Sequence, residues 1–113
     1  MINAEDIKDF KEYQDTAWSY ALDTAKNPGY LFTGLAGEAG EVCSLAAKQW
    51  RDDSKSLKEF QKELSKELGD VLWFCAGLAS QYGLNMMDIA KTNIEKLESR
   101  KQRGTIQGSG NDR

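Results

Sequence analysis

Two pairs of carboxylates have the spacing of a shared cation site. Glu38 and Glu41 lie within the Ala- and Gly-rich stretch 34–45, and Glu67 and Asp70 directly precede the apolar run that starts at Val71. Residues three apart project from the same face of a helix. An unpaired carboxylate beside an apolar run is costly to bury, so four such acids favour a shared divalent cation.

The chain contains no histidine. This absence excludes histidine general-base catalysis, Ser-His triads, most catalytic zinc sites and the Glu-x-x-His ligands of ferritin-like di-iron bundles. Any metal in the predicted site is therefore held by oxygen, which points to Mg²⁺ or Mn²⁺.

A single pair of acids three residues apart is a weak signal, because exposed helix faces carry many such pairs. Here the two pairs fall on separate predicted helices, which could pack antiparallel with their acids facing each other. Neither pair has a cation four residues on, since Val42 follows Glu38 and Phe74 follows Asp70 at that spacing. From the spacing alone, a metal site and two solvated helix faces both remain open.

Four helices are predicted to position these acids. The apolar spacing predicts a first helix from Ala4 to about Lys26, capped by Asn3 and stopped by the segment 27–29, with one buried stripe along it. A second helix is predicted over about 30–50, a third from Ser56 to 82–83, and a fourth from after Asn85 to Gly104. The predicted core residues are Ile7, Phe10, Ala17, Trp18, Ala21, Leu22 and Ala25 in the first helix and Ile89, Ile94 and Leu97 in the fourth.

Three glycines at a spacing of three interrupt the second helix, namely Gly34, Gly37 and Gly40. Each destabilises a helix by about 1 kcal/mol relative to Ala. Such a row permits close approach, either by another helix or by a ligand, and the pattern favours neither.

The composition indicates one soluble globular domain. The chain has 113 residues, 40% hydrophobic and 29% charged, with a single proline and a net charge of −3. The negative charge argues against nucleic-acid polymers and anionic membranes as partners. No signal peptide or membrane-spanning run is seen in the sequence. We expect Cys43 and Cys75 to be small buried residues rather than a disulfide. A cytoplasmic location is therefore expected.

Three segments taken together resemble a known family. These are 34–42 with its Glu-x-x-Glu, 67–73 with its Glu-x-x-Asp, and 93–101 with its Asn-x-x-Lys. In this order they resemble the MazG-like nucleotide pyrophosphohydrolases of the all-α NTP pyrophosphatase superfamily, which includes dimeric dUTPases and dCTP pyrophosphatases. The resemblance covers roughly residues 28–103.

The resemblance implies roles for individual residues. Glu38, Glu41, Glu67 and Asp70 match the family's Mg²⁺ ligands, and Mn²⁺ is an expected substitute. The positions that match substrate-binding or basic positions of the family are Lys48, Asn93, Lys96, Arg100 and Lys101.

The implied reaction is hydrolysis of a nucleoside triphosphate between the α and β phosphates, giving a monophosphate and pyrophosphate. Such a reaction needs charge neutralisation and an aligned water more than covalent chemistry from the protein. Glu38 or Glu41 could orient or deprotonate that water, and the sequence does not choose between them. For the basic residues of the fourth helix the alternative is a solvated face, which we prefer only for Arg103.

Base recognition needs a stacking partner. Trp18, Trp50 and Trp73 are candidates, although aromatic residues at helical spacing are more often core residues. Trp50 precedes a polar connection and is the one most expected to be exposed. The resemblance further implies a housecleaning role, with deoxynucleotides such as dCTP or dATP, or non-canonical nucleotides, as substrates.

The predicted fold is therefore an all-α, four-helix MazG-like bundle over residues 1–104, followed by a flexible tail over 105–113. Its short length suggests that neighbouring subunits complete the core, and the resemblance implies a homodimer or homotetramer. The alternatives are a non-catalytic helical module that binds nucleotides or a protein, and a structural bundle whose acids face solvent.

Overall fold

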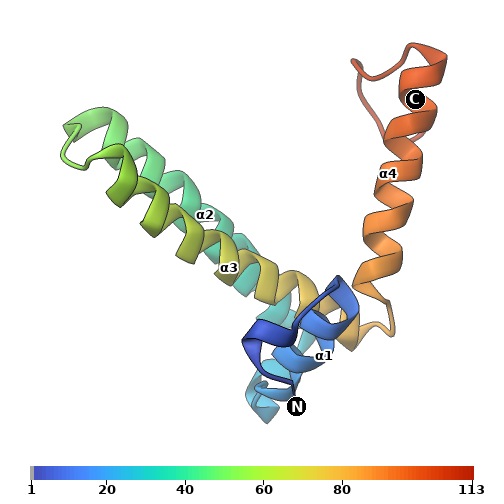
Figure 1. The fold of residues 1–113 in the computed structure, drawn as a ribbon, viewed down its shortest axis with the longest axis horizontal. Coiled ribbons are helices and arrows are strands. Elements are labelled where there is room, and N and C mark those ends of the chain that lie inside the picture. The colour runs from blue at the N-terminus through green and yellow to red at the C-terminus, as the bar shows by residue number, and fades with distance from the viewer. Residues whose placement is uncertain (1) are drawn as a thin grey trace.

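The computed structural model describes residues 2–113, and this part of the chain is all-α (Figure 1). Its four helices are α1 (Phe10–Ser19), α2 (Pro28–Asp52), α3 (Leu57–Gln81) and α4 (Met86–Arg103). Two short 3₁₀ turns, η1 (Ala4–Asp6) and η2 (Asp23–Lys26), flank α1. The prediction of an all-α chain with four helices is confirmed. None of the helices formed by residues 2–113 combines the length and hydrophobicity that a bilayer crossing requires.

The prediction of one continuous first helix over 4–26 was wrong. The Asp9 side chain accepts a hydrogen bond of 2.8 Å from the backbone N–H of Glu12 and begins α1 there, whereas the Asn3 side chain makes no capping bond. Beyond α1 the backbone is extended at Leu22, with ψ of 162°. Asp competes for nearby backbone N–H groups, and the Asp9-x-x-Glu12 spacing of a capping box was the overlooked signal.

The segment predicted to stop the first helix instead starts α2. The Asn27 side chain accepts a hydrogen bond of 2.8 Å from the Gly29 N–H, and Pro28 is the first helical residue. Proline suits this position because its missing N–H would have had no partner in the helix. The helix ends at Asp53, whose φ of 46° lies in the left-handed region.

The predicted limits of α3 and α4 are confirmed. Ser56 Oγ accepts the Glu59 N–H at 3.1 Å and caps α3. At the other end, Gly83 has a positive φ of 68°, which glycine adopts without strain. Asn85 caps α4 by accepting the Met87 N–H, and Gly104 follows its last residue.

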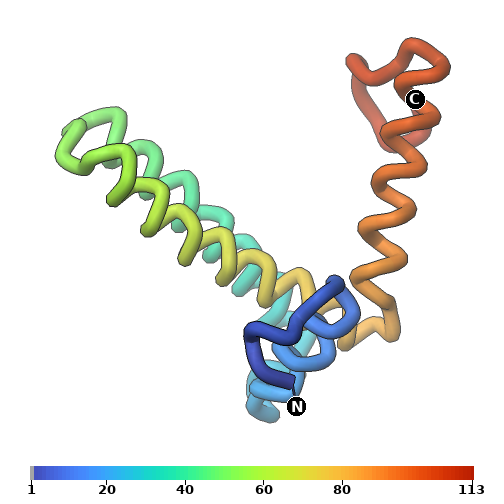
Figure 2. Tube along the Cα trace, viewed as in Figure 1, coloured from blue at the N-terminus to red at the C-terminus, as the bar shows by residue number. Residues whose placement is uncertain are grey.

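Helices α2 and α3 form a long antiparallel hairpin, and α1 packs against α3 near its C-terminal end (Figures 1 and 2). Helix α4 leaves this assembly at an angle and lies apart from the hairpin. One buried cluster sits where α1, α3 and the start of α4 meet, and consists of Ala17, Ala76, Ala79 and Met86. Leu31 and Phe74 are also buried, on α2 and α3 respectively.

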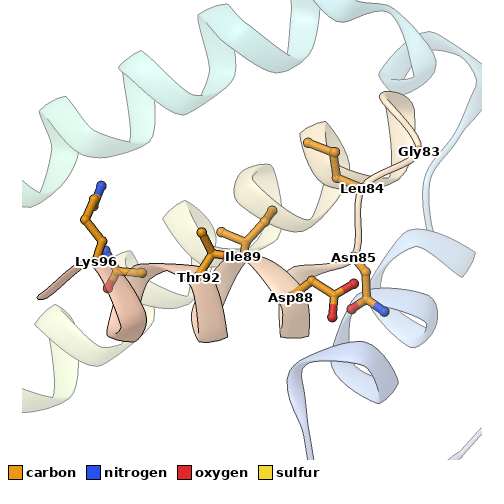
Figure 3. Close-up of a pocket in the computed structure, with 8 residues that line it drawn as sticks. Gly83, Leu84, Asn85, Asp88, Ile89, Thr92 and Lys96 are labelled. Atoms are coloured by element: carbon orange, nitrogen blue, oxygen red, sulfur yellow. The ribbon is translucent and has the colours of Figure 1, made fainter. Parts of the chain in front are cut away.

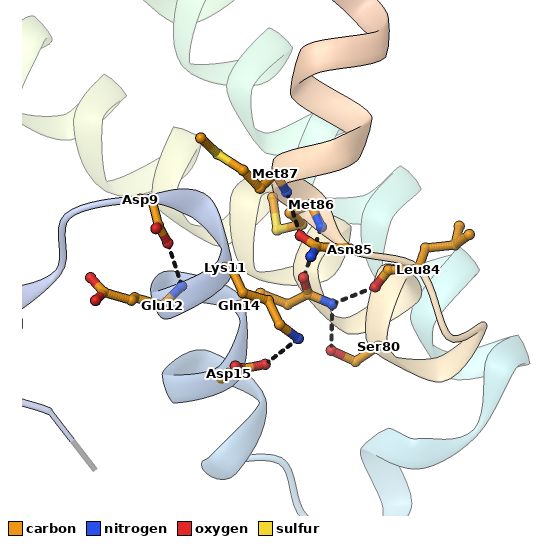
Figure 4. Close-up of polar contacts among 10 residues, drawn as sticks. All are labelled: Asp9, Lys11, Glu12, Gln14, Asp15, Ser80, Leu84, Asn85, Met86 and Met87. Carbon is orange, nitrogen blue, oxygen red and sulfur yellow. Dashed lines mark hydrogen bonds and ion pairs between the residues drawn. The ribbon is translucent and has the colours of Figure 1, made fainter.

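A buried glutamine holds the start of α4 (Figure 4). Gln14 on α1 is 2% exposed, and its Nε2 donates to Ser80 Oγ at 3.0 Å and to the Leu84 carbonyl at 2.8 Å. Its Oε1 accepts the Met86 N–H at 2.8 Å. One side chain therefore satisfies polar groups of α3, of the turn after it and of α4, and so fixes the position where α4 leaves the core.

The row of glycines has two different environments. A Cβ on Gly34 would overlap the Phe74 ring of α3, so this glycine permits helix packing. Gly37 and Gly40 have nothing within 4 Å of an added Cβ among the described residues. Helix packing thus accounts for the first glycine and not for the other two.

The predicted core was partly wrong. Ala17 and Ala25 are buried, but Phe10, the first residue of α1, is 40% exposed. Leu22 is 73% exposed because α1 ends at Ser19, before a single stripe could reach it. On α4 the predicted core residues Ile89, Ile94 and Leu97 are all exposed, since α4 lies apart from the hairpin. Both cysteines are free thiols, and Cys43 is exposed rather than buried.

Candidate metal and substrate site

The hairpin brings the two acid pairs to the same level. Glu38 lies 14 residues before the last residue of α2, Asp52, and Asp70 lies 13 residues after the first residue of α3, Leu57. Both helices rise by the same distance per residue, so positions that are about equally far from the short turn between them lie opposite each other. The register of the hairpin therefore follows from the length of each helix between its acids and the turn.

Three of the four predicted ligands converge. One carboxylate oxygen each of Glu38, Glu67 and Asp70 lies within 4.8 Å of the other two. Glu38 and Glu67 are half-buried, and Asp70 is exposed. Two helices thus supply three oxygen donors to one point on the surface of the hairpin.

The electrostatics of Glu38 reflect this crowding. The pKa of Glu38 is raised, first by partial removal of its carboxyl group from water and then by the negative charges of Asp70, Glu67 and Glu41. Both effects disfavour the ionised form, and a bound cation would reverse the second.

Glu41 takes a different position from the other three acids. It is exposed, and among residues 2–113 it does not join the group of oxygens within 4.8 Å. It remains close enough for its charge to raise the pKa of Glu38. Glu41 therefore lies at the edge of the cluster, one helical turn from Glu38.

Tyr13 of α1 is a neighbour of the cluster that sequence reasoning missed. The pKa of its phenol is raised by burial, then by charge on Cys75, and then by the Asp70 carboxylate. Tyr13 and Ala17 share a helix face, which was the available signal, but the sequence did not reveal that α1 crosses α3 near Asp70.

The predicted substrate residues of α2 lie farther along the helix. Lys48 is exposed and follows Glu41 by seven residues, about 10 Å along the axis. Trp50 is 85% exposed, as expected, but it is about 18 Å along the axis from Glu38. Within one chain the indole therefore stands well away from the acid cluster.

The predicted substrate residues of α4 line a separate groove. An open groove of about 520 Å³ is formed by the turn after α3 and the first half of α4, and both Asn93 and Lys96 line it (Figure 3). Leu84, Ile89 and Lys96 project from the same side of this segment. None of the four acids lines the groove. Within one chain the acids and these residues belong to different surfaces.

The last two predicted residues lie near the end of α4. Lys101 is exposed, whereas Arg100 is only 5% exposed and contacts the segment that follows α4. Sequence reasoning did not anticipate this burial, because arginine is seldom buried unless it is paired.

The donor set suits a hard divalent cation. Glu38, Glu67 and Asp70 offer only oxygen, from two helices and at one point, and the exposure of Asp70 leaves room for water and for a ligand's oxygens. Mg²⁺ prefers this chemistry, since it takes few carboxylates and retains several waters. The acids therefore fit the cation that the resemblance implies.

Comparison with known proteins identifies the family. The model of the MazG nucleotide pyrophosphohydrolase domain matches residues 26–105, which include all four acids. The chain is 42% identical over 105 residues to the Gene 37 protein of Mycobacterium phage L5, covering 82% of this chain and 92% of that protein. It is 32% identical over 100 residues to the uncharacterized protein YvdC of Bacillus subtilis strain 168, covering 83% and 88% respectively. No solved structure matches the chain. The chain belongs to the family of the MazG nucleotide pyrophosphohydrolase domain.

Proposed function

We propose that this protein is a Mg²⁺-dependent nucleoside triphosphate pyrophosphohydrolase that releases pyrophosphate and a nucleoside monophosphate. The observation that carries the proposal is the convergence of Glu38, Glu67 and Asp70 from two helices. Family membership supports a nucleotide as the substrate. Deoxynucleotides such as dCTP or dATP, or non-canonical nucleotides, are the substrates we propose, in a housecleaning role.

The three converging acids would hold Mg²⁺, which supplies positive charge to the phosphate oxygens. Glu41 lies at the edge of the cluster, and we propose that it binds the attacking water. Its carboxylate would orient that water and accept its proton as the water oxygen bonds to phosphorus. The bond between that phosphorus and the bridging oxygen then breaks, and the bridging oxygen leaves with its electron pair.

The remaining substrate residues require a second subunit. Asn93 and Lys96 line a groove that contains none of the acids, and α4 lies apart from the hairpin, which supports a site shared between subunits. In a homo-oligomer, α4 of one subunit can lie along the hairpin of another and bring an amide and an ammonium group to the acids. Lys48 would offset phosphate charge on the α2 side, and Trp50 could stack on a base only across such an interface.

The experiment that tests this proposal is a substrate panel. Pyrophosphate release is measured from canonical and modified NTPs and dNTPs with Mg²⁺, with Mn²⁺ and with EDTA. We expect metal-dependent release from a few deoxynucleotides. If a folded protein released no pyrophosphate from any substrate of the panel, this result would favour the alternative of a non-catalytic nucleotide- or protein-binding module.

The Glu41→Gln substitution should abolish release while leaving the protein folded and its oligomeric state unchanged. Loss of a general base typically slows a reaction by about 10²–10⁴-fold. Glu5→Gln, which changes an exposed acid of η1 outside both the cluster and α4, is the matched control and should retain activity. Full activity in Glu41→Gln would remove this residue from the mechanism.

A further inference from the structure

Arg100 is a buried cation without an anionic partner. Its side chain is 5% exposed, and the ion pairs among residues 2–113 are formed by other cations, namely Lys11, Lys26, Arg51 and Lys55. An ionised group removed from water is destabilising unless it is paired or hydrogen-bonded. The arrangement leaves Arg100 with a strong unmet preference for an oxyanion.

The segment after α4 partly satisfies Arg100. Its Nη2 donates to the backbone carbonyls of Asn111 at 2.8 Å and Gly110 at 3.3 Å, while its buried Nε has no hydrogen-bond partner among residues 2–113. A guanidinium binds a phosphate or carboxylate through two parallel N–H groups, and neutral carbonyl dipoles are weaker acceptors. The carbonyls therefore occupy the Nη2 donor of the fork and leave the Nε donor unused.

Residues 105–113, which we call the C-terminal strap, double back beside α4 (Figure 2). Gly108 and Gly110 have positive φ values of 137° and 87°, which let the strap turn. Arg113 ties the strap to itself, since its guanidinium donates to the carbonyls of Thr105 at 3.2 Å, Ile106 at 3.1 Å and Gly110 at 2.6 Å.

Few apolar contacts hold the strap. Its one large apolar side chain, Ile106, is 45% exposed, and the Arg113 Nη bonds that close it are exposed to water. Segments with little buried apolar area and solvent-exposed hydrogen bonds open at low free energy. The strap can therefore be displaced without disturbing the helical core.

We propose that the C-terminal strap is an autoinhibitory cover over Arg100, which a phosphate-bearing ligand must displace before it binds this guanidinium. The strap carbonyls stand where phosphate oxygens would otherwise be held. In the free protein the strap is in equilibrium between a closed and an open form. A bound ligand shifts this equilibrium toward the open form. The choice of a phosphate-bearing ligand rests on the proposed function, whereas the covering of Arg100 does not.

Two variants of the full chain release the strap. Arg113→Ala removes its three internal hydrogen bonds, and Gly110→Val places a β-branched residue at a positive φ. Asn111→Ala is the matched control, because Arg100 contacts only the backbone carbonyl at that position. Circular dichroism establishes that each variant is folded. The two release variants open the strap by different means, one by loss of hydrogen bonds and the other by backbone strain.

The first readout is the rate at which phenylglyoxal modifies Arg100, followed by mass spectrometry. We expect slow modification in the unaltered protein and in Asn111→Ala, and much faster modification in both release variants. The second readout is calorimetric binding of inorganic pyrophosphate. If the strap is open about one tenth of the time, its release strengthens binding about tenfold, and the gain disappears in Arg100→Ala/Arg113→Ala.

Equal modification of Arg100 in all of these proteins, or a binding gain that persists without Arg100, would overturn the strap proposal. The substrate panel separates this outcome from failure of the proposed function. Hydrolysis with an unchanged KM in both release variants rejects the strap and leaves the function standing. Faster modification and tighter pyrophosphate binding without hydrolysis support the strap and reject the function.

Discussion

At the scale of single residues, charge repulsion organises the candidate site. The pKa of Glu38 is raised, first by partial removal of its carboxyl group from water and then by the charges of three other acids. Such a cluster is unfavourable when empty and favourable around a cation, so the same side chains that destabilise the free hairpin would give it affinity for metal.

Substitution of one cluster acid should abolish stabilisation by metal. At a Mg²⁺ concentration of about 100 times Kd, binding stabilises the native state by about 2.7 kcal/mol and raises Tm by roughly 10 °C. Glu67→Gln should lose this shift, because it removes one of the three converging oxygens. Thermal unfolding with Mg²⁺ and with EDTA measures it, and Glu59→Gln, outside the cluster, serves as the control. An undiminished shift in Glu67→Gln would place the cation elsewhere.

In the metal-free protein, the contribution of Glu38 to stability should fall as pH rises through the titration of this residue. Because the folded state raises the pKa of Glu38 above 4.5, it binds this proton more tightly than the unfolded chain does. The resulting stability is present below pH 4.5 and is lost as pH rises from there through the raised pKa. Glu38→Gln imitates the protonated form, so its Tm advantage in EDTA should grow across this window. A difference independent of pH would contradict the prediction.

At the scale of helices, the α2–α3 hairpin is the element that builds the site. Its register aligns the acids, and its close approach depends on Gly34, which faces the ring of Phe74. Phe74 is buried, and its ring lies edge-on to Trp73 with centroids 5.2 Å apart. An added methyl group at Gly34 therefore has no space unless the hairpin opens.

Gly34→Ala should destabilise the protein by about 1–3 kcal/mol, the usual effect of overpacking. Gly40→Ala is the matched change six residues on, where nothing lies within 4 Å of the new Cβ among the described residues. It should stabilise the helix by about 1 kcal/mol. Urea unfolding measures both. Reduced activity in a stable Gly40→Ala would indicate that a ligand or a second subunit approaches α2 there.

At the scale of the whole molecule, a single chain is more open than its size predicts. Its radius of gyration is 16.8 Å, against about 13 Å for a compact chain of this length. Its accessible surface is 8245 Å², against roughly 6200 Å² for a monomer of 12.7 kDa. The difference of about 2000 Å² is comparable with the surface that each partner buries in an obligate dimer.

We therefore expect a homo-oligomer in which a second subunit covers the apolar face of α4. Ile94 is 63% exposed on this helix, and Ile94→Asp should place an unpaired charge in the interface and shift the protein toward monomers. Lys62→Asp, on the solvated face of α3, is the control. Sedimentation equilibrium measures the change. A monomeric unaltered protein, or a variant of unchanged mass, would exclude this face as the interface.

Features that depend on neighbours within a helical turn could be predicted from the sequence. The Ser56 cap, the Gly83 and Gly104 ends and the spacing of the acids all follow from local backbone and side-chain chemistry. The three motifs also led to the family, because their order along the chain does not depend on packing. The break in the first predicted helix was local too, through Asp9 and Glu12, and was overlooked.

Features that depend on contacts between distant segments followed from the three-dimensional structure alone. It separated Glu41 from the three converging acids, brought Tyr13 near Asp70, and left the apolar face of α4 uncovered in one chain. It also folded the strap over Arg100. Periodicity identifies the apolar and polar faces of a helix, but the direction in which a helix leaves a turn is set by long-range packing and by single buried groups such as Gln14.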